Sequence, residues 1–222
     1  MGSLSKKFEY ISEHYKARGL KHALTVIYRK IASPNCSHRI LFALSKPRPV
    51  DLAIESAKDH TFKFAEVDEL KKLQANPDYF ISDEYVGHVA NGSARCLLQL
   101  DGEKLAGYAW IWTHKLAYID DGFHLNLPDD TIYNFKGYTN PDYRGFGYQA
   151  LRHVKLLELL KDEGVKRLFG FVEYRNLRSL SGVKKSGYER VGTLTIAENK
   201  KKQKVSMKVE LDDHFWSKKA RT

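Results

Sequence analysis

A short glycine-containing segment holds the residues of this chain that are best suited to bind an anion. Arg144 is followed by Gly145 and Gly147. A glycine lets the main chain approach a ligand closely, and a guanidinium can hold phosphate oxygens. The segment lies between a predicted strand and a long predicted helix, so free backbone amides and the positive end of a helix dipole point into one volume. Phosphate binding is the chemistry that this arrangement predicts.

The same pattern is also typical of an ordinary tight turn that leads into a helix. Two other phosphate-binding motifs do not fit it. A Walker loop requires Gly-Lys-Ser/Thr, which does not follow here, and the dinucleotide fingerprint requires a third glycine and an acidic residue after the next strand. From these residues alone, a phosphate site and a plain turn both stay open.

Hydrophobic periodicity predicts the elements that position this segment. Strands are expected over residues 61–67, 95–100, 105–112, 131–139, 167–174, 189–196 and 204–211. Helices are expected over residues 68–74, 147–163 and 177–186, with Arg152, Lys155 and Glu158 on the outer face of the second helix. An antiparallel first half joined to a strand-helix-strand-helix second half predicts a mixed sheet with helices on its faces, an α+β (α/β layer) fold.

The composition is that of a folded globular protein. The chain has 222 residues, of which 42% are hydrophobic and 29% charged, enough for one domain with a substantial core. No apolar run is long enough to cross a membrane and the first residues lack a secretory apolar region, so we expect a cytoplasmic protein. Cys36 and Cys96 are too few for a disulfide framework or a paired-cysteine zinc site, and the nine histidines show no ligand spacing, so no metal is expected.

The positive charge of the chain is concentrated at its two ends. Within a net charge of +10, residues 1–48 carry 10 basic and 2 acidic side chains, and residues 199–222 carry 8 basic and 3 acidic ones. The body between them is mildly acidic, which argues against nucleic acid as a partner.

Residues 5–31 form a predicted basic amphipathic helix. With the breaker at Pro47 and Pro49, this predicts an N-terminal helical arm over residues 1–58 and a folded body over residues 59–222. Such a helix packs on its own domain, lies peripherally on an anionic membrane, or docks an acidic carrier protein.

Two linked motifs resemble those of the GCN5-related N-acetyltransferases. The family signature Arg/Gln-x-x-Gly-x-Gly/Ala is approached by residues 144–149, after Pro-x-Tyr-Arg-Gly at residues 141–145. The second family pattern is Val-x-x-x-Asn-x-x-Ser/Ala and then a helix that ends in Lys-x-Gly-Phe. Its positions are occupied here by Val172, Asn176, Ser179, Lys185, Gly187 and Tyr188. The resemblance covers about residues 61–211.

The resemblance implies a mixed, mostly antiparallel sheet that is splayed open between the strands ending near Thr139 and Tyr174. It also implies acetyl-CoA or another acyl-CoA as co-substrate. The amides of residues 144–149 would hold its diphosphate, the strand edge at residues 138–139 its pantetheine arm, and the residues near the next helix its thiol end. The implied cofactor-binding residues are Tyr138, Thr139, Arg144, Gly145, Phe146, Gly147, Tyr148, Gln149, Asn176 and Ser179.

Two departures from the family pattern bear on binding and catalysis. Gln149 stands where the family has Gly or Ala, so its side chain must point away from the diphosphate. Val183 stands where the family often has a tyrosine that protonates the leaving thiolate. Candidates for the remaining proton transfers are Glu173 and His124 as bases and Tyr174 as an acid.

The function expected from these features is transfer of an acetyl or other acyl group from acyl-CoA to a small-molecule amine, by direct attack within a ternary complex. The basic arm gives the chain a loose likeness to enzymes that modify amino sugars or other surface-polysaccharide intermediates near a membrane. Two alternatives stay open: an acyltransferase that uses an acyl carrier protein, and a member of the fold that binds CoA or a partner without catalysis.

Overall fold

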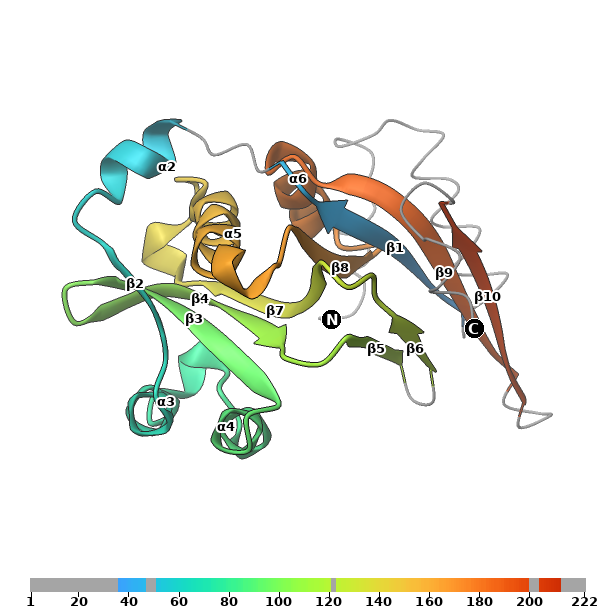
Figure 1. Cartoon of the computed structure of the whole chain (residues 1–222), viewed down its shortest axis with the longest axis horizontal. Coiled ribbons are helices and arrows are strands. Elements are labelled where there is room, and N and C mark those ends of the chain that lie inside the picture. The colour runs from blue at the N-terminus through green and yellow to red at the C-terminus, as the bar shows by residue number, and fades with distance from the viewer. Residues whose placement is uncertain (1–35, 47–50, 121–122, 200–203, 213–222) are drawn as a thin grey trace, which may run out of the picture.

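The computed structural model describes residues 36–46, 51–120, 123–199 and 204–212. In this part of the chain eight strands form one sheet in the order β10-β9-β1-β8-β7-β4-β3-β2, and β5 pairs with β6 (Figure 1). The strands are β1 Cys36–Leu44, β2 Thr61–Phe64, β3 Ala94–Asp101, β4 Lys104–Trp112, β5 Leu116–Asp120, β6 Phe123–Asn126, β7 Thr131–Thr139, β8 Arg167–Glu173, β9 Glu189–Asn199 and β10 Lys204–Leu211. Strands β7 and β8 are parallel and the other described neighbours are antiparallel.

Helices cover both faces of the sheet. They are α2 Asp51–Ser56, α3 Val67–Gln74, α4 Asp83–Ala90, α5 Tyr148–Leu159 and α6 Leu177–Lys185, with 3-10 turns η1 Pro77–Tyr79, η2 Pro141–Tyr143 and η3 Lys161–Glu163. Figure 1 shows α3 and α4 on one face and α5 on the other. The mixed, mostly antiparallel α+β fold predicted from the sequence is confirmed. Among the described residues, none of the helices is sufficiently long and apolar to span a bilayer.

The sheet opens where β7 and β8 stop pairing. Thr131–Tyr133 of β7 pair with Arg167–Phe169 of β8, and the pairing ends there. In the β4–β7 ladder the register shifts at the same level, because Trp110 pairs with Lys136 while Ile111 pairs with Asn134. The extra residue, Phe135, forms a bulge, and a bulge bends its strand. The second half of β7 therefore keeps β4 as its partner and leaves β8 (Figure 1).

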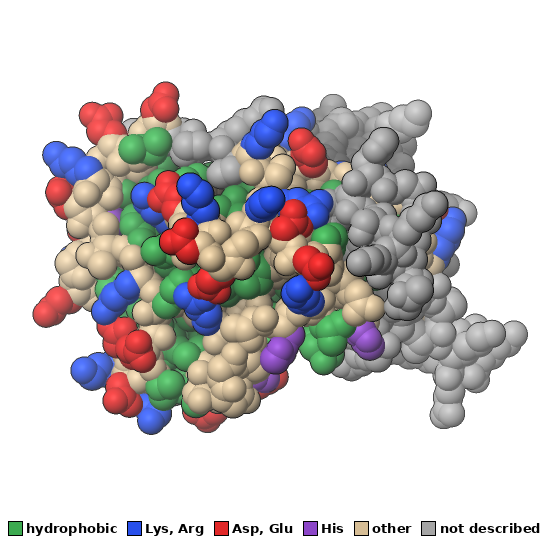
Figure 2. Space-filling model, viewed as in Figure 1, with side chains coloured by type: hydrophobic (Ala, Val, Ile, Leu, Met, Phe, Trp, Pro, Cys, Tyr) green, Lys and Arg blue, Asp and Glu red, His purple; other side chains and the backbone are tan. Residues whose placement is uncertain are grey.

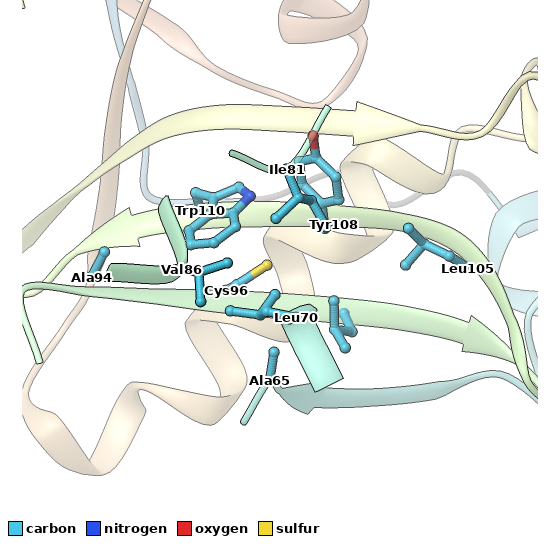
Figure 3. Close-up of a cluster of buried hydrophobic side chains, with 10 residues drawn as sticks. Ala65, Leu70, Ile81, Val86, Ala94, Cys96, Leu105, Tyr108 and Trp110 are labelled. Atoms are coloured by element: carbon cyan, nitrogen blue, oxygen red, sulfur yellow. The ribbon is translucent and has the colours of Figure 1, made fainter. Parts of the chain in front are cut away.

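Both faces of the central strands are buried, which explains their nearly continuous apolar sequences. On β3, Cys96 and Leu98 pack toward α3 and α4, whereas Leu97 packs toward α5. Figure 3 shows the first cluster, with Trp110 and Tyr108 of β4 among the side chains of α3 and α4. Cys96 is a buried free thiol, as expected.

The predicted division into an arm and a body needs a correction for residues 36–46 and 51–58. Strand β1 lies inside the sheet, with Arg39 opposite Glu173 of β8 and opposite Leu194 of β9. Ala53 of α2 and Ala57, directly after this helix, are buried in a cluster with Tyr148 and Leu151 of α5. These residues belong to the folded body because they complete its sheet and its core. The predicted helix over residues 5–31 lies outside the described residues.

Several predicted elements differ from the observed ones at their ends. The strand predicted over residues 61–67 ends at Phe64, because Glu66 and Glu69 form a capping box that starts α3 at Val67. The helix predicted over residues 147–163 ends at Leu159 and is followed by η3. No element was predicted between residues 112 and 131, where the structure has β5 and β6.

Candidate functional site

The segment between β7 and α5 is anchored to the body from behind. The Asn140 backbone amide donates to the Ala106 carbonyl at 3.0 Å, and its side-chain Nδ2 donates to the Leu105 carbonyl at 3.0 Å. The Tyr143 hydroxyl donates to Asp101 Oδ2 at 2.8 Å, which attaches η2 to the β3–β4 turn. These bonds fix the loop without using the amides that follow it.

The amides at the start of α5 have no protein acceptor. In the described part of the chain, none of the backbone N–H groups of residues 145–149 donates to a protein atom. Gly145 and Gly147 have φ values of 94° and 85°, a left-handed conformation that favours glycine. Gly147 is the N-cap of α5, so the last of these amides lie at the positive end of the helix dipole. Five unused donors at a helix N-terminus can bind an anion with several negative oxygens.

Arg144 differs in part from its predicted role. Its backbone amide donates to the Pro141 carbonyl at 3.2 Å, so the donor set predicted over residues 144–149 starts at Gly145 instead. The Arg144 side chain is exposed and its Nε donates to the Thr139 carbonyl at 3.2 Å. That bond directs the guanidinium back over the end of β7, next to the loop.

These amides donate no hydrogen bond to the side chains of their own segment, Phe146, Tyr148 and Gln149. Gln149 turns toward α6, where its Oε1 lies 3.0 Å from the position that a Cβ atom on Gly182 would take. This meets the requirement set by the departure from the family pattern. Tyr148 is buried and its hydroxyl donates to the Ser56 carbonyl at 3.3 Å, while Phe146 is exposed and stacks on the Tyr148 ring at 5.5 Å.

Tyr138 and Thr139 lie on the half of β7 that has left β8. The Tyr138 ring stacks on Tyr108 at 5.2 Å and lies 6.1 Å from the rings of both Tyr79 and Phe80. Partial burial raises the pKa of Tyr138. The Thr139 hydroxyl oxygen accepts a hydrogen bond from Arg152 Nη2 at 2.6 Å. The edge of β7 that faces away from β4 is unpaired with β8 at both residues.

Asn176 and Ser179 begin α6. Asn176 is the N-cap residue, and its Oδ1 accepts a hydrogen bond from the Ser179 amide at 3.0 Å. The three-residue spacing between them is thus explained by helix capping. Val183 is buried further along the same helix. Through Gly182, α6 contacts Gln149 and so borders the loop.

The three candidates for proton transfer come from different places in the fold. Glu173 ends β8 and its Oε1 accepts from Arg39 Nε at 2.9 Å. A carboxylate that is already paired with a guanidinium is less available to remove a proton from an amine. His124 is an exposed residue of β6, with its ring 6.0 Å from that of Tyr118. Tyr174 is half-buried directly after β8. Their catalytic roles stay predictions.

A buried polar network beneath the loop was missed by the sequence analysis. Arg152, predicted on the outer face of its helix, is only 1% exposed, and its Nη1 donates to Gln99 Oε1 at 2.8 Å. Gln99 Nε2 lies 2.9 Å from His60 Nδ1, and His60 Nε2 lies 3.9 Å from Asp101 Oδ1. The helical spacing indicated that Arg152 is buried, because it stands four residues after Tyr148 and four before Leu156, and both of these are buried.

The described residues contain no group of three or more His, Cys, Asp or Glu side chains that could hold a metal ion. No protein-family model matches the chain, and no curated protein sequence matches it.

Solved structures similar to the chain include several acetyltransferases. An aminoglycoside acetyltransferase from an uncultured soil metagenomic sample, in complex with trehalose, has a TM-score of 0.46 at 10% identity, over 59% of this chain and 88% of that chain. A GCN5-related N-acetyltransferase-like protein from Streptococcus suis has a TM-score of 0.45 at 14% identity, over 78% and 66%. A predicted acetyltransferase with acetyl-CoA from Clostridium acetobutylicum has a TM-score of 0.39 at 16% identity, over 59% and 90%.

Proposed function

We propose that this protein is an acyl-CoA-dependent N-acyltransferase that transfers an acetyl group from acetyl-CoA to an amine. One observation carries the proposal: the amides of residues 145–149 have no acceptor in the described part of the chain and lie at the N-terminus of α5, directly after the strand that leaves β8. A diphosphate needs several N–H donors in one place, and an extended chain needs a free strand edge. The free amides and the unpaired edge of β7 lie side by side here.

In this proposal the diphosphate of acetyl-CoA accepts hydrogen bonds from the amides of residues 145–149, and Arg144 contacts it from the loop. The pantetheine arm follows the unpaired edge of β7 at Tyr138 and Thr139. Asn176 and Ser179 flank its thiol end. Because Asn176 Oδ1 is used as a helix cap, the Nδ2 group is the part of this side chain that we assign to the ligand.

The proposed reaction is a direct transfer. The amine nitrogen attacks the thioester carbonyl carbon, a C–N bond forms, the C–S bond breaks, and the electron pair leaves on the CoA sulfur. The nitrogen loses one proton, for which Glu173 and His124 are the proposed bases and Tyr174 the proposed acid toward the thiolate. Val183 offers no hydroxyl, and a thiolate is a fair leaving group without one.

The acceptor proposed is a small-molecule amine, such as an amino sugar or another intermediate of surface polysaccharides. The supporting observation is the aromatic surface of Tyr79, Phe80 and Tyr138 beside the open half of β7. Phe80 is 65% exposed and is the C-cap residue of η1, with a φ of 53°. Aromatic rings stack on the apolar faces of sugars and attract ammonium groups.

Thermal unfolding and thiol release with acetyl-CoA test this function together. We expect acetyl-CoA to stabilise the protein by about 2.7 kcal/mol when its concentration is a hundred times its dissociation constant. We also expect it to release free thiol when a reactive amine from a panel of hexosamines and simple amines is present. Arg144→Glu should abolish the stabilisation. Lys161→Glu is the matched control, because it makes the same charge change beyond the opposite end of α5.

Absence of any stabilisation by acetyl-CoA contradicts the proposed cofactor. Stabilisation without thiol release across the panel contradicts the proposed reaction and leaves a CoA-binding protein. Equal losses in Arg144→Glu and Lys161→Glu contradict the assignment of the loop as the site.

A further inference from the structure

Arg152 carries a charge that no described residue neutralises. Its side chain is 1% exposed, and its guanidinium donates to two neutral oxygens, Gln99 Oε1 at 2.8 Å and Thr139 Oγ1 at 2.6 Å. Among the described residues, no aspartate or glutamate forms an ion pair with it. Buried charges in proteins are normally paired with an opposite charge, so a guanidinium with neutral partners needs another explanation.

The groups that surround Arg152 are also uncharged at neutral pH. Burial raises the pKa of the Cys96 thiol and of the Tyr108 hydroxyl, which keeps both protonated. Burial, with the neighbouring Arg152, lowers the pKa of His153 to about 3, so this imidazole is neutral. Burial lowers the pKa of Arg152 itself to about 9, which leaves it charged at neutral pH. The groups in direct contact with Arg152 therefore leave its positive charge uncompensated. The nearest carboxylate of the network, Asp101, is half-exposed and is reached only through Gln99 and His60.

The fold makes room for this charge beneath the loop. Arg152 stands one turn after Tyr148, so its backbone is about 6 Å along α5 from the first turn. Its guanidinium packs on Gly107 of β4, where a Cβ atom would lie 2.4 Å from Nη1. It bonds the hydroxyl of Thr139, the last residue of β7. Arg152 thus lies between the end of β7 and the helix whose N-terminus carries the unused amides.

We infer that Arg152 is a specificity-determining residue whose buried charge is neutralised by the diphosphate of the acyl-CoA at the start of α5. This rests on the proposed function and extends it. Arg152 acts through space and through Thr139, as a positioning residue, and it does not touch the reacting atoms. Because water is excluded around the guanidinium, its attraction for an anion is screened less than that of the exposed Arg144.

Isothermal titration with two donors separates the charge from a structural role. Acetyl-CoA carries the diphosphate and S-acetylpantetheine lacks it. In Arg152→Met we expect acetyl-CoA to bind about tenfold more weakly or worse, while S-acetylpantetheine binds as to the unaltered protein. Arg152→Lys should retain most of the affinity for acetyl-CoA. Lys155→Met is the matched control, because it removes a charge from the exposed side of α5 and should change neither titration.

If Arg152→Met does not fold, Arg152→Gln is a second neutral variant. Its side-chain amide is a hydrogen-bond donor on the side of Gln99 and Thr139. The ligand-free melting temperature of each neutral variant, measured beside the titrations, shows whether the variant is folded. Equal losses for both donors, or no loss in the neutral variants, overturn the inference. If the unaltered protein binds neither donor, the proposed function fails instead, and the two failures are therefore distinguishable.

Discussion

Two neighbouring residues of α5, Arg152 and His153, are buried although both have ionisable side chains. His153 is 4% exposed, its Nδ1 has no partner among the described residues, and its ring meets Tyr188 edge-on at 5.2 Å. A neutral imidazole tolerates this environment, whereas a protonated one does not. Burial, with the charge of Arg152, lowers its pKa from 6.5 to about 3.

This burial predicts a pH-dependent stability. Between pH 6.5 and about 3 the folded state binds fewer protons at His153 than the unfolded chain does, so the free energy of unfolding falls as the pH falls. We expect a loss of about 2 to 3 kcal/mol between about pH 6.5 and pH 4.5 from this group. Urea unfolding at a series of pH values measures it, and His153→Leu should show a shallower slope.

His114→Leu serves as the control, because it removes an exposed histidine and keeps the buried one. A slope in His153→Leu equal to that of the unaltered protein would show that His153 does not contribute to the acid sensitivity.

At the residue scale, the sequence predicted those features that depend on neighbouring residues in the chain. Gly145 and Gly147 were selected for backbone freedom, and both have positive φ. The partners of Arg152 could not be read in the same way, because Gln99 lies 53 positions away and belongs to a strand that α5 covers. Whether a charged residue of an amphipathic helix faces water or a polar partner depends on the element opposite.

At the scale of elements, the start of α6 combines two roles that substitutions can separate. Asn176 caps the helix through Oδ1, and in the proposed function its Nδ2 contacts the pantetheine. Asn176→Ala should therefore lower the free energy of unfolding by about 1 kcal/mol. It should also weaken acetyl-CoA binding, as measured by titration of the folded variant.

Ser82→Ala is the matched control, since Ser82 caps α4 by accepting a hydrogen bond from the Tyr85 amide at 3.4 Å. It should lower stability in the same range and leave the affinity for acetyl-CoA unchanged. An Asn176→Ala variant that binds acetyl-CoA normally would limit Asn176 to its capping role.

The long, patterned elements were predicted well and the short or partner-dependent ones were not. The strand over residues 131–139 was predicted with its observed ends, because a clear apolar pattern stops at Asn140-Pro141. Strand β1 was not among the predicted strands. Its place in the sheet depends on distant partners: Arg39 of β1 pairs with Glu173 of β8, 134 positions further along the chain. Helices α2 and α4 were not predicted, and α2, with six residues, is too short for a strong periodic signal.

At the scale of the whole molecule, the described N-terminal elements β1 and α2 connect the β8–β9 part of the sheet with helix α5. Strand β1 pairs with β8 and β9, while α2 packs against the first turns of α5. The same α5 carries the unused amides at its start and Arg152 one turn later. The helix that carries the site is therefore supported by α2, which follows β1 in the chain.

Charge on the surface does not mark a single binding face. In Figure 2, Lys and Arg side chains lie interspersed with Asp and Glu side chains over the described elements of the face shown. Attraction of an anionic ligand is therefore expected to be local. It arises from the free amides, the helix dipole, Arg144 and the buried Arg152.

The amide groups themselves give the most direct test of the central claim. In a ¹⁵N–¹H titration of the whole chain with CoA, we predict that the amide protons of residues 145–149 move downfield, because they become donors to charged phosphate oxygens. The amides at the open half of β7 should shift by smaller amounts, and those of β10 should stay in place. If CoA binds and the amides of residues 145–149 do not move, the diphosphate is held elsewhere and the account is contradicted.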